Sequence, residues 1–503
     1  MHHAVKNLAK ETIIYSLSDI VARGCSYFVL LLQTGILAPS VYGIVTEFYG
    51  SYIAFGGVVY LLSMDMAYFR FVNKLGRQYT FNTIVTILLL TSTIFSIILL
   101  LSIPKIATIT NHLSHVRCFY YVVAILILDT LLIIPYSVLR AEKKIVKFIS
   151  IKSLQATLSI VFSFILLYLP ACLRYMEYVI YKSFHITVHL NTLDAIFITT
   201  LLSNATTFVF LLPYFKGFHF TCNKEVLRMM FSYASTSFFT TLFFRLSDIL
   251  PILLFRKLVP TDFYEGHTKE EILGNLGTSY KLTLFISLGI QAFKYAAEPF
   301  FFAYSDRKDA TKLYGQTMHL FILASCMALL LISLNIDWIA KILVPHAPYR
   351  NTIDTVPYLA FVRILLGIYY NFSIAFKLSN KPQYSTWISA LGSFVIWAMA
   401  LLLMPRLGHW GGVYASISGA AIITLFGYYV GKKCYPIPYY KHGFLLLLLT
   451  FCLLSKISAW PATISFLGLG WAYLLLNIIV IASFCAIVMV MHKHMNPHSA
   501  LKH

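Results

Sequence analysis

Charged residues lie inside two apolar segments that are each long enough to cross a membrane. Segment 227–255 contains Arg245 and Asp248, and the next apolar segment along the chain contains Lys294 and Glu298. A charge in hydrocarbon costs several kcal/mol unless the side chain faces protein or water. These four residues therefore predict a polar site or pathway within the membrane.

The spacing of these charges indicates which way they face. Polar residues recur every three or four positions in both segments, at 237, 241, 245 and 248 and at 287, 291, 294 and 298. On an α-helix this spacing places them on one side. We predict two helices that line a shared polar cavity. Lys281 lies about 100° away from the second stripe, and we expect it to pack against a neighbouring helix.

Four further spans carry charges at comparable depth. These are Asp19 and Arg23 in the first span, Glu47 and Asp65 in the second, Asp129 in the fourth and Arg363 in the tenth. Asp19 and Arg23 are one turn apart, a spacing that permits an ion pair. Arg363 has no acidic residue one turn away on its own helix, so it is either the partner of a group on another helix or a free contact for a ligand.

The composition is that of a polytopic α-helical membrane protein. Of 503 residues, 59% are hydrophobic and 12% are charged, with a mean hydropathy of +0.76. These values exclude a soluble globular protein, and apolar runs near 20 residues exclude an outer-membrane barrel. The net charge of +20 is explained by basic cytoplasmic loops rather than by nucleic acid. The eight cysteines contain no CxxC pair, and we expect neither disulfides, nor a metal site, nor a bound cofactor.

We predict fourteen transmembrane spans, each near the ~20 residues that cross the hydrocarbon core. Their expected ranges are 11–33, 42–66, 80–103, 117–139, 148–169, 192–213, 226–255, 275–302, 316–335, 355–376, 384–404, 410–431, 442–459 and 464–491. With the N-terminus inside, the cytoplasmic segments carry about twice as many Lys and Arg as the outer segments. Both termini are therefore expected in the cytoplasm.

A weak internal repeat predicts how the spans are grouped. Asp65 near the end of span two corresponds to Glu298 near the end of span eight, six spans later. A repeat of six spans preserves orientation, so the halves are expected to be parallel, with the site between them. We predict an N-terminal lobe at 1–220, a C-terminal lobe at 221–436, and two extra spans with a cytoplasmic tail at 437–503.

Several short segments, in their order along the chain, carry a resemblance to a known family. They are LAKETIIYSLSDIVARG near the start, the PSVYG turn, FRLSD in span seven, QAFKYAAEPFFFA in span eight and VPYLAFVRILLGIYYNFSIAFKLSNK around span ten. From about residue 8 to residue 433 the chain resembles polysaccharide-biosynthesis flippases of the Wzx type, in the multidrug/oligosaccharidyl-lipid/polysaccharide (MOP) exporter superfamily. The two extra C-terminal spans are similar to those of lipid II flippases in that superfamily, where a groove holds the lipid tail.

This resemblance implies a fold, a cargo and a site. The fold has two six-helix lobes around a central cationic cavity. The cargo is an undecaprenyl-pyrophosphate-linked oligosaccharide, moved from the inner to the outer leaflet of the bacterial inner membrane by alternating access for lipopolysaccharide, O-antigen or other cell-envelope polysaccharide. The cations that fit contact with pyrophosphate or acidic sugars are Arg23, Arg245, Lys294 and Arg363. A glycan polymerase or ligase is a possible partner beside membrane lipids.

Each charge also has a structural interpretation. Guanidinium groups match phosphate oxygens in bidentate geometry, but Arg245 can instead be neutralised by Asp248, and Arg23 by Asp19. Lys294 with Glu298 has the same ambiguity. The acids that could pair within the cavity or carry a coupling H⁺ or Na⁺ are Asp19, Glu47, Asp65, Asp129, Asp248 and Glu298.

Three other functions compete with this interpretation. A lipid II flippase for peptidoglycan synthesis remains open. A multidrug or cation antiporter should have a cavity rich in acids, whereas this one is expected to be cationic. A polytopic glycan polymerase or ligase should carry acids in a sizeable outer loop, yet the longest outer segment has about 20 residues. With no catalytic triad, phosphate-binding loop or metal-ligand cluster in the sequence, we predict that the protein is not an enzyme. We expect the acidic connection 262–271 to be an exposed loop of little mechanistic weight.

Overall fold

In the computed structural model every described element is helical. The structure describes residues 24–25, 27–142, 144–184, 189–221, 223–303, 309–379, 381–457 and 482. Within these residues, ten helical segments are long and apolar enough to cross a membrane, and they coincide with predicted spans two to seven and nine to twelve. The prediction of an all-helical, multi-pass membrane protein is confirmed. Most of the last predicted span and most of the first lie outside the described residues.

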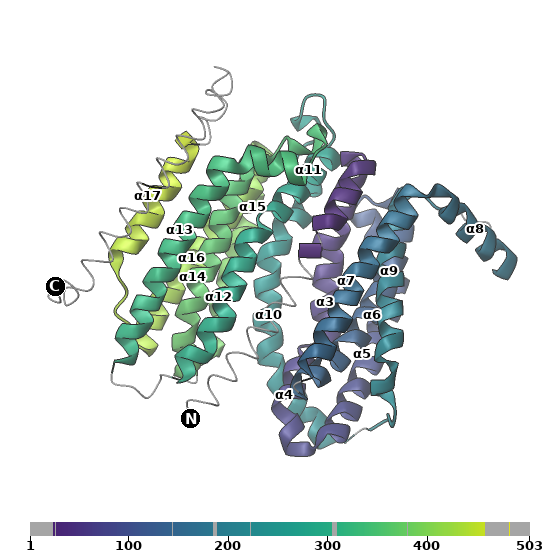
Figure 1. Ribbon diagram of the computed structural model, residues 1–503, viewed down its shortest axis with the longest axis horizontal. Helices are drawn as coiled ribbons and strands as arrows, with labels where there is room; N and C mark the ends of the chain where they lie inside the picture. The colour runs from purple at the N-terminus through teal and green to yellow at the C-terminus, as the bar shows by residue number, and fades with distance from the viewer. Residues whose placement is uncertain are drawn as a thin grey trace.

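The first group of helices forms one side of the molecule (Figure 1). It follows a short apolar helix at Tyr27–Ile36. Its members are α2 (Pro39–Glu47), α3 (Ala54–Leu61), α4 (Met64–Leu75), α5 (Arg77–Ile109), α6 (Val116–Ala141), α7 (Ile145–Tyr168), α8 (Pro170–Phe184) and α9 (Thr192–Leu211). A π-helical segment, Phe48–Ile53, joins α2 to α3. π-Helical turns are rare and often occur at functional sites.

The second group forms the other side, with α10 between the two groups (Figure 1). Its members are α10 (Lys224–Leu258), α11 (Lys269–Leu282), α12 (Leu284–Ala303), α13 (Ala310–Leu343), α14 (Val356–Leu378), α15 (Gln383–Leu407), α16 (His409–Cys434) and α17 (Lys441–Ile457). The start of α10 packs with α4, α5 and α6, whereas its end packs with α11, α15 and α16. The same helix therefore contacts both groups.

Two predicted spans are interrupted. The second span contains the π-helical segment and then a left-handed break at Leu62 and Ser63, whose φ angles are 50° and 54°. The eighth span, expected as one helix over 275–302, is divided at Thr283 into α11 and α12. The prediction that the eighth span is one continuous helix was therefore wrong. Side chains before and after the break need not share one face.

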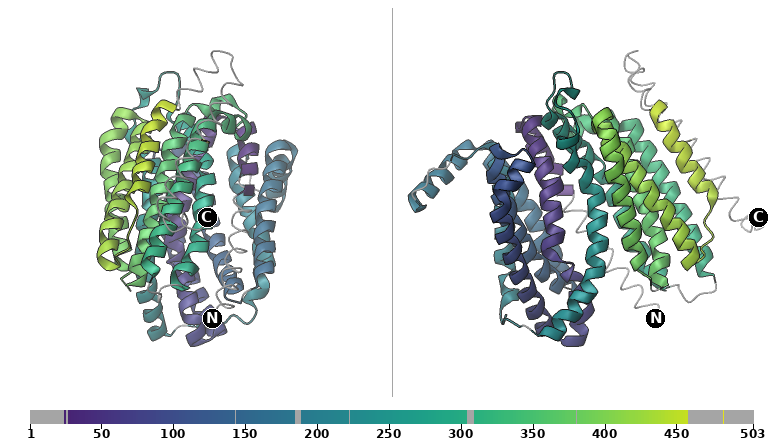
Figure 2. Two further views of the ribbon diagram at one scale, coloured as in Figure 1. Left: turned by 60° about the vertical axis from the view of Figure 1, so that its left-hand side comes forward. Right: turned by 180° about the vertical axis from the view of Figure 1, so that it is seen from behind.

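The two groups share a hydrophobic core at one end of the bundle. This core contains Tyr42 and Phe48 from the first group together with Leu282, Ala340 and Tyr349 from the second. In Figure 2 the purple helices that begin the first group lie beside the α11 end of the second group. We refer to this end, where α2 meets α11, as the α2–α11 end.

Candidate functional site

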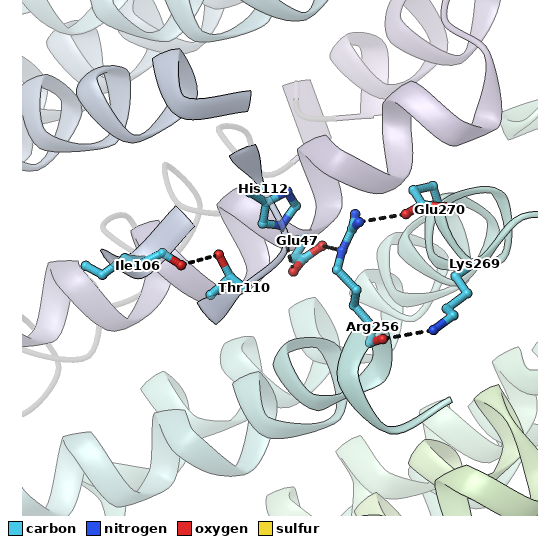
Figure 3. A network of polar contacts seen from close by, with 7 residues as sticks. All are labelled: Glu47, Ile106, Thr110, His112, Arg256, Lys269 and Glu270. Atoms are coloured by element: carbon cyan, nitrogen blue, oxygen red, sulfur yellow. Dashed lines mark hydrogen bonds and ion pairs between the residues drawn. The ribbon is translucent and has the colours of Figure 1, made fainter. Parts of the chain in front are cut away.

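Ion pairs link the two helix groups at the α2–α11 end (Figure 3). Glu47 is the last residue of α2, and its side chain is 2% exposed. Arg256, in the last turn of α10, places Nε 2.9 Å from Glu47 Oε2 and an η nitrogen 2.6 Å from Glu270 Oε1 of α11. One guanidinium therefore holds carboxylates from both groups, in the planar geometry that favours arginine.

A buried histidine completes this network. His112 is fully buried, and its Nε2 lies 3.0 Å from Glu47 Oε1. The rings of Phe48 and Phe119 pack around the imidazole, with centroid distances of 5.1 Å and 6.2 Å. Both oxygens of the Glu47 carboxylate thus lie within 3.0 Å of a nitrogen, and the hydrogen bond from Arg256 compensates the removal of this carboxylate from water.

Glycines allow α2 and α11 to approach very closely. A Cβ at Gly43 would lie 1.9 Å from the carbonyl oxygen of Glu270, and one at Gly274 would lie 2.1 Å from that of Pro39. A Cβ at Gly277 would lie 2.1 Å from Thr46 Oγ1. Small residues at such positions permit tight helix packing within a membrane. The α2–α11 contact therefore depends on the absence of side chains.

A pocket of about 440 Å³ lies beside this contact, between the two groups. Most of its surface is apolar, but hydroxyl, amide and ammonium groups also line it, and we call it the polar pocket to distinguish it from the apolar groove described below. Its walls come from the helix that begins at Tyr27, from α2 and the π-helical segment, and from α7, α9, α10 and α11. Among the described residues that line it, Lys281 is the charged one. The Lys281 ammonium lies 5.2 Å from the centroid of the Tyr42 ring, and Tyr27 donates a hydrogen bond to the Lys281 carbonyl at 2.9 Å.

An apolar groove of about 530 Å³ runs along α14, α16 and α17. Its lining includes Phe361, Phe372, Leu425, Leu448 and Phe451, and its polar contribution is small. Phe361 and Phe451 stack with centroids 4.0 Å apart, so α17 is held against α14 beside the groove. A groove of this composition suits an alkyl or isoprenoid chain.

The predicted residues Asp248 and Arg363 are brought together across two helices. An η nitrogen of Arg363 on α14 donates to Asp248 Oδ1 on α10 at 2.6 Å, with both side chains about a quarter exposed. Tyr280 of α11 lines both the small cavity beside this pair and the polar pocket. Asp248 is therefore neutralised by Arg363, and Arg363 acts as a cross-helix partner.

Among the other predicted cations, Arg245 and Lys294 do not line the polar pocket. Arg245 is exposed on α10 and forms no ion pair with any residue the structure describes. Lys294 on α12 places its ammonium 4.3 Å from the centroid of Tyr370. Arg23 and Asp19 lie outside the described residues, as does the side chain of Glu298.

The remaining predicted acids lie within the first helix group. Asp129 on α6 accepts a hydrogen bond from Asn204 Nδ2 at 2.7 Å, and Asn204 accepts one from Gln155 Nε2 at 2.8 Å. Asp65 is half-buried in the first turn of α4. Neither is in an ion pair within the described chain, in contrast to Glu47 and Asp248.

Sequence reasoning missed Arg256, Glu270 and His112 as partners of Glu47. The connection 262–271 makes specific contacts. Glu270, in the first turn of α11, binds Arg256, and Tyr264 packs against the start of α16. The small weight of this connection in transport stays a prediction. Tyr264 accepts a hydrogen bond from the His409 backbone at 2.7 Å, and burial raises the pKa of Tyr264 to about 12. Glycines at 43, 274 and 277 were a signal in the sequence for this close contact.

The fold and the site define a multi-pass, all-helical membrane protein with a polar pocket between two helix groups. No protein-family model matches the chain, and no curated protein matches its sequence. Among solved structures, it is similar to the lipid II flippase MurJ in an inward closed conformation, with a TM-score of 0.69 and 13% identity over 95% of this chain and 98% of that one.

Multidrug transporters have the same fold. The inward-facing conformation of a multidrug resistance MATE family transporter of the MOP superfamily gives a TM-score of 0.63 at 13% identity, covering 82% of this chain and 93% of that one. An outward-facing conformation of a transporter of the same description gives 0.56 at 15% identity, covering 85% and 95%. At such identities the likeness establishes the fold, which is that of these transporters.

Proposed function

We propose that this protein is a flippase that moves an undecaprenyl-pyrophosphate-linked oligosaccharide from the inner to the outer leaflet of the cytoplasmic membrane. The observation that carries this proposal is the presence of two different ligand surfaces on one fold. The pocket between the helix groups is more polar than the groove and contains Lys281, whereas the groove along α14, α16 and α17 is almost entirely apolar. An amphiphile with a glycan at one end and a long hydrocarbon chain at the other matches both surfaces.

The proposed mechanism is alternating access between a lobe at 1–220 and a lobe at 221–436. With both termini in the cytoplasm, as the loop charges predict, the α2–α11 end faces the outside. The Glu47–Arg256–Glu270 ion pairs and the glycine contacts then close the outer exit. The higher TM-score with the inward-facing than with the outward-facing MATE structure, 0.63 against 0.56, supports this conformation.

The charges have distinct proposed roles. Arg245, which lacks an acidic partner among the described residues, and Arg23 would contact the pyrophosphate while it crosses the membrane. Asp129 is the best candidate for a coupling H⁺ or Na⁺, because its described partner is a neutral amide. Glu47 and Asp248 are less suited to that role, since arginines already neutralise them.

Lipid II is the second candidate cargo. The observation that favours it is the match to MurJ, which covers 95% of this chain. Both candidate cargoes carry their glycan on the same type of polyprenyl carrier, whether the glycan is used for O-antigen, other lipopolysaccharide or peptidoglycan. A later polymerase or ligase would use the translocated product.

Reconstitution in vesicles tests the proposal. Purified protein is placed in liposomes with a fluorescent undecaprenyl-pyrophosphate oligosaccharide, and exposure in the second leaflet is followed with a membrane-impermeant quencher. We expect the protein to expose this lipid in the second leaflet. Fluorescent phosphatidylcholine, the control lipid, should not be exposed by the protein. A rate equal to that of protein-free vesicles, or equal flipping of both lipids, would contradict the proposal.

A further inference from the structure

The wall of the polar pocket contains buried oxygens without partners. Gln33 Oε1, Ser163 Oγ and Thr199 Oγ1 meet no hydrogen-bond partner in the described part of the chain. These side chains are 6%, 1% and 3% exposed, and they come from three separate helices. Buried polar groups in proteins are normally satisfied, so these three pocket-lining side chains have hydrogen-bonding capacity that the described chain does not use.

The pocket also contains aromatic rings and one cation. Tyr42, Tyr49 and Tyr280 line it together with Lys281. Amphipathic tyrosine rings pack on the apolar faces of sugar rings, while hydroxyl and amide groups hydrogen-bond to sugar hydroxyls. The described contact of the Lys281 ammonium is the Tyr42 ring, with no carboxylate beside it. The pocket therefore has one positive charge that its described walls leave uncompensated.

We propose that this pocket binds a single sugar ring that carries one acidic group, and that Lys281 contacts this group. The inference rests on the proposed transport of a lipid-linked glycan and assigns part of that glycan to a place in the fold. A volume of about 440 Å³ is in the range of ligand pockets and accommodates a sugar ring with a substituent. The single cation of the described lining matches a single acidic group.

The acidic group is either the carboxylate of a sugar acid or a phosphate ester, and both accept charge-assisted hydrogen bonds from an ammonium. Lysine presents a point charge and does not select between planar and tetrahedral anions by geometry. The position of Lys281 one turn beyond Gly277 places the acidic sugar directly beside the α2–α11 contact. A ligand in the pocket would thus lie next to the α2–α11 contact that closes that end.

The test compares three polyprenyl-pyrophosphate trisaccharides that end in glucose, glucuronic acid or glucose 6-phosphate. Each is assayed in vesicles with the wild type, Lys281→Gln, Lys281→Arg and Lys312→Gln. The last variant removes one positive charge at an exposed position of α13 and serves as the control. We expect Lys281→Gln to slow one or both acidic lipids roughly tenfold or more, as the loss of a charge-assisted hydrogen bond implies, with the glucose lipid unchanged. Lys281→Arg should retain most of the acidic rate.

The outcomes separate this inference from the proposed function. If the wild type flips all three lipids and Lys281→Gln slows them equally, or slows none, the acidic-sugar site is wrong while the flippase proposal stands. If the wild type flips none of the three lipids, the flippase proposal fails. A binding measurement then tests the acidic-sugar site on its own. Free glucuronate or glucose 6-phosphate, at matched ionic strength, should raise the melting temperature of the wild type, whereas glucose should not. Absence of any such shift in the wild type would overturn the inference without requiring a variant to fold.

Discussion

The guanidinium of Arg256 and the carboxylate of Glu47 lie 2.9 Å apart, although 209 positions separate them in the sequence. This ion pair joins the end of α10 to the end of α2. Removing one partner of a buried pair leaves the other charge uncompensated, which costs about 3–5 kcal/mol. The same loss would weaken the closure of the α2–α11 end.

We therefore expect Glu47→Gln to loosen this end. With the native cysteines replaced, a cysteine at Thr46 in the polar pocket should react faster with an impermeant maleimide added from the α2–α11 side. Glu265→Gln, which neutralises an exposed acid in the connection before α11, is the control. Equal labelling rates in wild type and Glu47→Gln would show that the ion pair does not hold the end closed.

The glycine contact provides a second test of closure. Gly274→Ala would place a methyl group 2.1 Å from a backbone oxygen of Pro39, so α2 and α11 must separate. We expect a loss of about 1–3 kcal/mol in stability, or increased access to the pocket, from this overpacking. Gly57→Ala is the matched control, because nothing lies within 4 Å of its added Cβ. Thermal unfolding in detergent and maleimide access to the pocket measure the two effects.

The positions of most spans could be predicted from the sequence. Ten predicted spans coincide with described helices, because a run of apolar residues near membrane length has few alternatives. The partners of the charges could not be predicted in the same way. Arg363 and Asp248 lie on separate helices, and their contact depends on how α10 and α14 pack.

Lys281 packs against a neighbouring helix, as predicted, because its ammonium lies 5.2 Å from the ring of Tyr42 on α2, but the reasoning behind that prediction was incomplete. Its predicted direction assumed one continuous helix through residue 302, whereas the helix is divided at Thr283. The stripe at 287, 291, 294 and 298 belongs to α12, so it does not determine which way α11 presents Lys281. Periodicity alone gave no sign of this division.

Arg245 and Arg363 should respond differently to neutralisation. Arg363→Ala leaves Asp248 without its partner, and we expect a loss of about 1–3 kcal/mol, less than for a fully buried pair because both side chains are about a quarter exposed. The double variant with Asp248→Ala should recover part of this loss. Arg245→Ala should leave the melting temperature nearly unchanged but slow flipping, with Arg245→Lys intermediate. Normal flipping by Arg245→Ala would remove Arg245 from the proposed cargo path.

Asp129 is the position at which we expect ion coupling to be lost. Asp129→Asn keeps a polar side chain beside Asn204 but cannot release a proton or bind Na⁺ as a carboxylate does. We expect the variant to fold and to lose the dependence of transport on an imposed pH or Na⁺ gradient. Asp194→Asn tests the alternative of a general helix defect, since Asp194 belongs to the capping box formed with Asn191 at the start of α9. An unchanged gradient dependence in Asp129→Asn would assign coupling elsewhere.

Membrane orientation can be measured independently of transport. The loop charges predict that position 308 faces the cytoplasm and that Gly266 faces outside. Single cysteines at Lys308 and Gly266 should therefore react from opposite sides of sealed vesicles. Reaction from the same side would overturn the predicted orientation, and with it the proposal that the α2–α11 end is the outer exit.

A substitution of Thr199 tests whether an unpartnered hydroxyl of the pocket wall binds the sugar. Its hydroxyl is buried without a partner in the described chain, so Thr199→Val removes a destabilising group and keeps the side-chain shape. Stability should stay the same or rise by up to about 1 kcal/mol, whereas flipping of glycan lipids should slow if the hydroxyl bonds to a sugar. Thr207→Val on the same helix is the control. The Thr207 hydroxyl donates to the Ser203 carbonyl at 2.6 Å, so its loss should cost about 1 kcal/mol in stability without affecting glycan transport. If Thr199→Val flips glycan lipids at the wild-type rate, Thr199 does not contact the sugar, and the pocket would have to bind its ligand through Gln33, Ser163 and Lys281.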